Sequence, residues 1–138
     1  MSMKKTLLGT LAGFVVLVAG RYLLHGIILA STYAELGDLL RAPADFMHRM
    51  WAVQLANLAF AHAATHIYQR GLESKPWMGQ GLRYGVLVAM ATAVPNSLIE
   101  YAVYPIGHRL AVHWILGEGV IAILMCLAIA AVCQPEKK

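Results

Sequence analysis

The amino-acid sequence alternates between four long apolar runs and short polar segments. The runs cover residues 6–31, 45–69, 81–104 and 108–133. Each holds about 24 to 26 residues, which is enough for a helix to cross a hydrocarbon core of about 30 Å. A backbone inside a bilayer satisfies its hydrogen bonds within its own segment, and short connections make successive helices antiparallel. The pattern predicts an all-α membrane protein, a single domain folded as an up-down bundle of four transmembrane helices.

Composition supports a membrane location. Of the 138 residues, 59% are hydrophobic and only 13% are charged, and the mean hydropathy is +0.62. A soluble domain carries about a quarter of charged residues. These values exclude a soluble enzyme, a disordered chain and a disulfide-stapled secreted module. The basic residues lie at the ends of the apolar runs, so we expect contact with the lipid bilayer and no nucleic-acid partner.

The basic residues also predict an orientation. If the N-terminus is inside, seven of them face the cytoplasm: Lys4, Lys5, Arg70, Lys75, Arg83, Lys137 and Lys138. Three face the other side: Arg41, Arg49 and Arg109. Because cytoplasmic loops carry the excess of basic residues, both termini are expected in the cytoplasm.

Polar side chains inside the apolar runs are the candidate functional residues, because such groups are costly in a membrane. Counted along helices at about 1.5 Å per residue, most fall in the outer half: Arg21, His25, Gln54, Asn57, Asn96, Glu100, His113 and Glu118. In the third run Thr92, Asn96 and Glu100 recur every fourth residue, which predicts one polar stripe on that helix.

Arg21, Glu100 and Glu118 predict an ion-paired network between the first, third and fourth runs, because a desolvated arginine favours a carboxylate partner. Two interpretations stay open. The network could hold the bundle together, or it could line an outward-facing, water-filled pocket for a small molecule or an ion. In such a pocket Arg21 would hold an anionic group or pair with a carboxylate, and Glu118 could exchange protons. Pro95 favours the pocket, because it frees the carbonyl near Ala91 and loosens the helix.

Two groups of residues have the side chains of metal sites. His62 and His66 are four residues apart on one predicted face, a spacing that can hold a metal. Met47, His48 and Met50 cluster at the start of the second run, where thioethers and an imidazole would suit copper. No carboxylate or cysteine stands at the depth of the histidine pair on another run, so we expect no metal at either group.

A haem b site would need histidines on two helices at equal depth, and His25 and His113 roughly meet that condition. No other feature supports haem, so we expect no cofactor and keep haem b or copper as alternatives.

Small residues predict how the helices pack. Gly9 and Gly13 are four apart, a spacing that lets two helices approach closely. Cys126 and Cys133 are about 10 Å apart on one helix, too far to form a disulfide. We expect the cysteines to face lipid or neighbouring helices.

Several short segments carry a resemblance to a known group of proteins. They are Leu24-His25-Gly26, Tyr33, Arg41, Arg83-Tyr84-Gly85, Pro95-Asn96, Tyr101, Pro105 and Trp114. In these segments the chain resembles small four-span bacterial inner-membrane proteins whose function is not established. The resemblance implies a bacterial inner-membrane location, and His62 and His66 are not part of it.

The sequence favours a non-enzymatic accessory or interaction subunit, acting in a homo-oligomer or a larger membrane complex. It contains no GxSxG, HExxH or glycine-rich phosphate loop that would indicate an enzyme. The first alternative is a binding or transport protein with the outward-facing pocket. The second is a redox subunit that carries haem or a metal.

Overall fold

The protein folds almost entirely into helices. The computed structural model describes residues 2–134, and helices account for 86% of the chain with no strand among the described residues. The α-helices are α1 (Met3–Arg21), α2 (Ala30–Glu35), α3 (Pro43–His48), α4 (Met50–Arg70), α5 (Trp77–Val103) and α6 (His108–Val132). A π-helix (Tyr22–Ile28) follows α1, and a 3-10 turn (Gly37–Leu39) follows α2. The predicted all-α class is confirmed.

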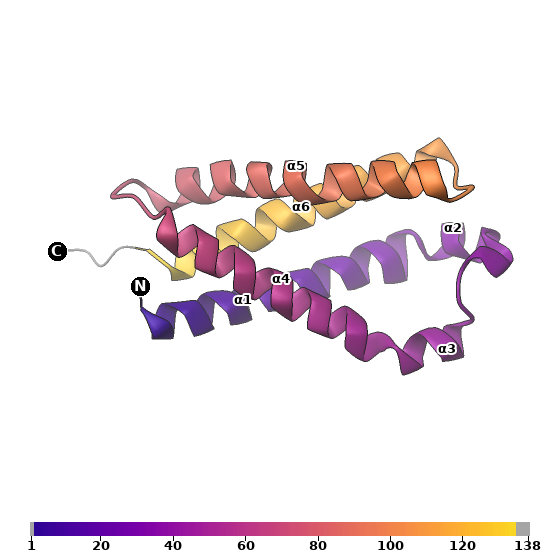
Figure 1. The fold of residues 1–138 in the computed structure, drawn as a ribbon, viewed down its shortest axis with the longest axis horizontal. Coiled ribbons are helices and arrows are strands. Elements are labelled where there is room, and N and C mark those ends of the chain that lie inside the picture. Colours follow the sequence, from indigo (N-terminus) through magenta and orange to yellow (C-terminus); the bar gives the residue numbers. More distant parts are fainter. Residues whose placement is uncertain (1, 135–138) are drawn as a thin grey trace.

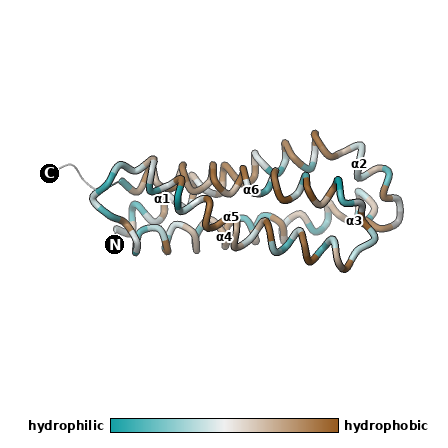
Figure 2. Tube along the Cα trace, turned by 90° about the horizontal axis from the view of Figure 1, so that it is seen from above, coloured by the Kyte–Doolittle hydropathy of each residue, from teal (hydrophilic) through white to brown (hydrophobic). Residues whose placement is uncertain are grey.

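Three helical segments are long and apolar enough to cross a membrane. They are Met3–Ile28, which joins α1 to the π-helix, then α5 and α6. Hydrophobic residues occupy most of the length of these helices (Figure 2). The chain is therefore a multi-pass membrane protein. The 21-residue α4 is less apolar, because it carries Gln54, Asn57 and His62.

The long helices pack in a fixed order. α5 packs along α6, α6 along α1, and α1 along α4, whereas α4 and α5 touch only slightly. The described ends of the chain lie together, at what we call the termini end, while α2 and α3 lie at the opposite, far end (Figure 1). From the termini end towards the far end, α4 diverges from α5 (Figure 1). The two helices are therefore farther apart in the far half of the molecule than at the termini end.

Glycines on α1 permit its close contacts with α4 and α6, as predicted. A Cβ atom on Gly9 would lie 2.7 Å from Cγ2 of Thr65 and 3.0 Å from Sγ of Cys133. One on Gly13 would lie 3.1 Å from Cδ1 of Ile129. Both cysteines are free and buried, so they face neighbouring helices rather than lipid.

Two predicted helices differ from the observed ones. The first run was predicted as one helix over 6–31, but its last turns form the π-helix, which ends at Ile28. The second run, predicted over 45–69, is interrupted at Arg49, where α3 ends and α4 begins. The Arg49 guanidinium donates to the carbonyl oxygen of Asp45 at 3.1 Å and to its carboxylate, and it thereby occupies the one backbone acceptor to which the Arg49 amide would bond in a continuous helix. The third helix continues through Pro95 without a break.

Candidate functional site

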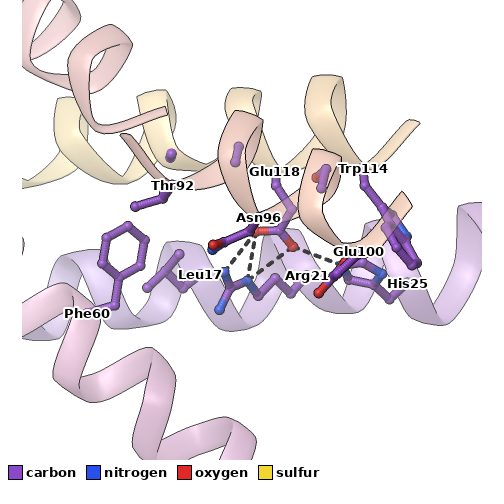
Figure 3. A pocket seen from close by; sticks show the side chains of 12 residues that line it. Leu17, Arg21, His25, Phe60, Thr92, Asn96, Glu100, Trp114 and Glu118 are labelled. Carbon is purple, nitrogen blue, oxygen red and sulfur yellow. Dashed lines mark hydrogen bonds and ion pairs between the residues drawn. The ribbon is translucent and has the colours of Figure 1, made fainter. Parts of the chain in front are cut away.

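An ion pair between Arg21 and Glu118 lies at the centre of the polar residues in the far half. Arg21 ends α1, and its Nε atom donates to both carboxylate oxygens of Glu118 on α6, at 3.2 and 3.0 Å. The Nη2 atom of Arg21 donates to Oε2 at 2.8 Å (Figure 3). The side chains of Arg21 and Glu118 are 30% and 20% exposed, so most of the ion pair is buried inside the protein. This side-on, two-pronged geometry is the one that guanidinium and carboxylate groups favour. The predicted contact between the first and fourth runs is confirmed.

Asn57 and His25 complete the bonding of this pair. The Nη1 atom of Arg21 donates to Oδ1 of Asn57, which is 1% exposed on α4. Nε2 of His25, in the π-helix, lies 2.8 Å from Oε1 of Glu118. Each oxygen of Glu118 thus has at least one strong hydrogen bond, and the cluster joins three of the long helices. The hydrogen-bonding groups of Arg21 and Glu118 are thus satisfied within this cluster of four side chains.

The cluster continues to the far end through Tyr33 on α2 and Trp114 on α6, which the sequence did not single out as site residues. Nε1 of Trp114 donates to the Tyr33 hydroxyl at 2.8 Å, and that hydroxyl is hydrogen bonded to Nδ1 of His25. The His25 and Tyr33 rings stack with centroids 5.8 Å apart and an interplanar angle of 14°. Burial raises the pKa of the Tyr33 phenol above its usual value, although the hydrogen bond from Trp114 acts in the opposite direction.

These partners link four side chains in a chain of hydrogen bonds. Because Trp114 has only an N–H donor, the Tyr33 oxygen accepts from it. Nδ1 of His25 is hydrogen bonded to the same Tyr33 hydroxyl, and Nε2 of His25 is hydrogen bonded to Glu118. A continuous hydrogen-bonded path therefore runs from α2 to the Arg21–Glu118 pair.

A cavity of about 230 Å³ lies against this cluster. The polar stripe Thr92, Asn96 and Glu100 of α5 lines one side, and the Phe60 ring of α4 lines another (Figure 3). Asn96 and Glu100 are exposed, so the cavity opens at the surface beside α5. Among residues 2–134 neither side chain has a hydrogen bond or an ion pair. Glu100 was predicted to join the ionic network, but Asn57 takes the remaining contact of Arg21 instead.

Two predicted residues lie apart from the cavity. Gln54 is half-buried on α4 and does not line it, and its Oε1 atom is buried without a hydrogen bond in the described part of the chain. His113 is exposed, and its Nδ1 atom donates to the carbonyl of Arg109 on its own helix at 2.6 Å. His113 therefore does not face His25 across the cavity as a haem pair would.

The candidate metal ligands remain dispersed. The rings of His62 and His66 are 6.3 Å apart, and Nδ1 of His62 is hydrogen bonded to the Thr10 hydroxyl at 3.3 Å. Met47 and His48 are exposed on α3. Within the described residues no group of three or more histidine, cysteine, aspartate or glutamate side chains is placed to hold a metal ion.

Comparison with known proteins gives no relative from which a function could be transferred. No family model matches the chain, and no curated protein or solved structure matches it. The resemblance to four-span bacterial proteins stays a prediction. The function is therefore argued from the chemistry of the cavity.

Proposed function

We propose that this chain binds a small polar molecule or an ion in the cavity between α1, α4, α5 and α6. The observation that carries the proposal is the pair of free polar side chains on the cavity wall. A network that served only to hold helices together would satisfy its own members, as Arg21 and Glu118 do. Asn96 and Glu100 instead face the cavity without a hydrogen bond or an ion pair among the described residues. A bound ligand would supply the missing partner.

The size and lining of the cavity support a small ligand. Its volume of about 230 Å³ is below the range of about 300–1,000 Å³ usual for drug-sized ligands. The wall combines apolar rings from Phe60 and Trp114 with the polar stripe of α5. Apolar walls with a few placed polar groups are typical of binding pockets.

We further propose that α4 is a fourth span, which gives an up-down bundle in a bacterial inner membrane with both termini in the cytoplasm. At about 1.5 Å per residue, α4 reaches about 32 Å. Two of its polar side chains, Asn57 and Thr65, are turned into the protein, whereas Leu55 and Leu58 are exposed. In this orientation the cavity opens in the outer half of the membrane. Reporter fusions after residue 138 and within 71–76 should both report a cytoplasmic location, and an external signal from either would reject the orientation.

Access of a small solute to Trp114 tests the pocket. Trp51 and Trp77 are replaced by phenylalanine, so that Trp114 is the only tryptophan of the protein in lipid nanodiscs, and it is excited at a wavelength that tyrosine does not absorb. Acrylamide, a small neutral quencher, should quench Trp114 readily. Thr92→Phe places a ring in the cavity and should reduce the quenching constant.

Leu98→Phe is the matched control. Leu98 is on the same helix, 51% exposed, and does not line the cavity, so this substitution should leave the quenching unchanged. Equal quenching in the parent, Thr92→Phe and Leu98→Phe would reject an accessible pocket. An accessory role in a homo-oligomer or larger complex stays a prediction, since the exposed apolar side chains fit lipid and protein partners alike.

A further inference from the structure

We propose that the ligand of this cavity is a small organic cation, an alkylammonium or similar group with an apolar body. This inference rests on the proposed binding function and adds the charge and class of the ligand. It follows from which charged groups of the site are already compensated and which are not.

The positive charge of the site is fully engaged. Arg21 directs Nε and Nη2 to Glu118 and Nη1 to Asn57, so each nitrogen of its guanidinium already has an acceptor and its charge is paired with that of Glu118. Both ring nitrogens of His25 are occupied by hydrogen bonds, one to Tyr33 and one to Glu118. An anion entering the cavity would find no free cation among these residues.

The negative charge is not fully engaged. Glu118 is compensated by Arg21, whereas the Glu100 carboxylate on the lining has no ion pair among residues 2–134. Its neighbours on the stripe also present acceptors. The Thr92 hydroxyl donates to the Val88 carbonyl at 2.7 Å, so its oxygen can only accept, and Asn96 can turn its amide oxygen to the cavity. The free wall therefore suits a cation that donates hydrogen bonds.

An organic cation fits this wall better than a metal ion. Ca²⁺ takes about six to eight oxygen ligands and Mg²⁺ takes six, whereas the free stripe offers one carboxylate. An ammonium group needs only a few acceptors and carries an apolar body. The Phe60 and Trp114 rings on the lining can contact that body, and an aromatic face attracts a cation.

Three probes of similar shape and different charge test this inference: propylammonium, propionamide and propionate. The readout is protection of Trp114 from acrylamide in the single-tryptophan protein in nanodiscs, at constant ionic strength. Propylammonium should protect Trp114 in a saturable way. Its half-saturating concentration should be about tenfold lower than that of propionamide, because a tenfold difference in affinity corresponds to about one hydrogen bond to a charged group. Propionate should not protect.

Glu100→Gln identifies the group responsible. It should raise the half-saturating concentration of propylammonium about tenfold and leave that of propionamide unchanged. Glu35→Gln is the matched control, because Glu35 is an exposed carboxylate on α2 outside the cavity. Asn96→Asp adds a second carboxylate to the stripe and should tighten propylammonium binding, which supplies a second variant if Glu100→Gln folds poorly.

The failures of the two proposals differ. If acrylamide reaches Trp114 but propionate or propionamide protects as well as propylammonium, or none of the three protects, the cation assignment is wrong. The same holds if Glu100→Gln and Glu35→Gln behave alike while Asn96→Asp has no effect. If acrylamide does not reach Trp114 and Thr92→Phe changes nothing, the pocket itself is rejected, and the cation assignment with it.

Discussion

Arg21 and Glu118, which are 97 residues apart in the chain, meet through a side-on pair of hydrogen bonds that joins the end of α1 to the middle of α6. Asn57 adds a contact from α4 to the same guanidinium. The ion pair and its contact with Asn57 thus connect α4, α1 and α6, which pack side by side in that order. Both side chains are more than two-thirds buried, so removal of one leaves the charge of the other largely desolvated.

Arg21→Ala should destabilise the protein by about 2–3 kcal/mol, because it leaves the Glu118 carboxylate with His25 as its remaining partner. Glu118→Gln should have a similar effect through the unpaired cation. The double variant Arg21→Met/Glu118→Leu should lose less than the sum of the two single losses, since no buried charge remains. Reversible unfolding in mild detergent, followed by helical circular dichroism, measures each value.

The control is the ion pair between Arg41 and Asp45, whose side chains are 62% and 43% exposed. Because water screens it, Arg41→Ala should cost less than about 0.5 kcal/mol. Equal losses for Arg21→Ala and Arg41→Ala would show that the central pair does not stabilise the bundle.

Tyr33→Phe should lower stability at neutral pH by about 1–2 kcal/mol, because the hydrogen bonds to Trp114 and His25 are lost. The pKa of the Tyr33 phenol is raised in the folded protein. Above pH 10 the unfolded chain therefore releases this proton while the folded protein still retains it, so stability falls as the pH rises. The parent and Tyr33→Phe should converge above pH 10 in thermal unfolding.

Tyr22→Phe serves as the control for this comparison. Its ring is 68% exposed, so the substitution should leave stability at neutral pH unchanged. Parallel stability curves for the parent and Tyr33→Phe above pH 10 would contradict the buried, hydrogen-bonded phenol.

The long helices could be predicted because their apolar length reflects the thickness of the bilayer. The π-helix at Tyr22–Ile28 could not, because a change from i→i+4 to i→i+5 bonding leaves no mark in hydropathy. The interruption at Arg49 depends on a side chain that bonds backwards to Asp45, which periodicity does not encode.

The site could be predicted only in part, for a related reason. Depth counting places Arg21, Glu118 and Glu100 in the same half of the bundle, and an intramembrane cation has few partners to choose from. Which carboxylate it reaches depends on the rotation of each helix, and this selects Glu118. Tyr33 lies in a polar segment outside the apolar runs. Its contact with His25 depends on how α2 folds back at the far end, and no local sequence pattern indicates this.

Gln80→Ala should loosen the connection between α4 and α5. The buried Gln80 side chain accepts from the Glu73 amide at 2.9 Å and donates to the carbonyls of Glu73 and Lys75 at 2.9 and 2.7 Å. Loss of these bonds should speed amide hydrogen exchange of Glu73 about tenfold, the equivalent of one to two neutral hydrogen bonds. Met78→Ala, at a 60% exposed position on the same helix, should not change it. Equal exchange in Gln80→Ala and the parent would mean that the side chain does not hold the segment.

Gly9→Ala should destabilise the contact of α1 with α4 by about 1–3 kcal/mol, because the added methyl group overpacks it. The new Cβ would lie 2.7 Å from Cγ2 of Thr65, and that side chain is fixed by the bond from its hydroxyl to the Ala61 carbonyl at 2.8 Å. The new Cβ would also lie 3.0 Å from Sγ of Cys133, so α1 cannot shift away from Thr65 without contacting Cys133. Gly79→Ala meets no atom within 4 Å and should instead stabilise α5 by about 0.5–1 kcal/mol through helix propensity. Opposite signs in detergent unfolding are expected, and a stabilising Gly9→Ala would mean that α1 and α4 do not approach this closely in the folded protein.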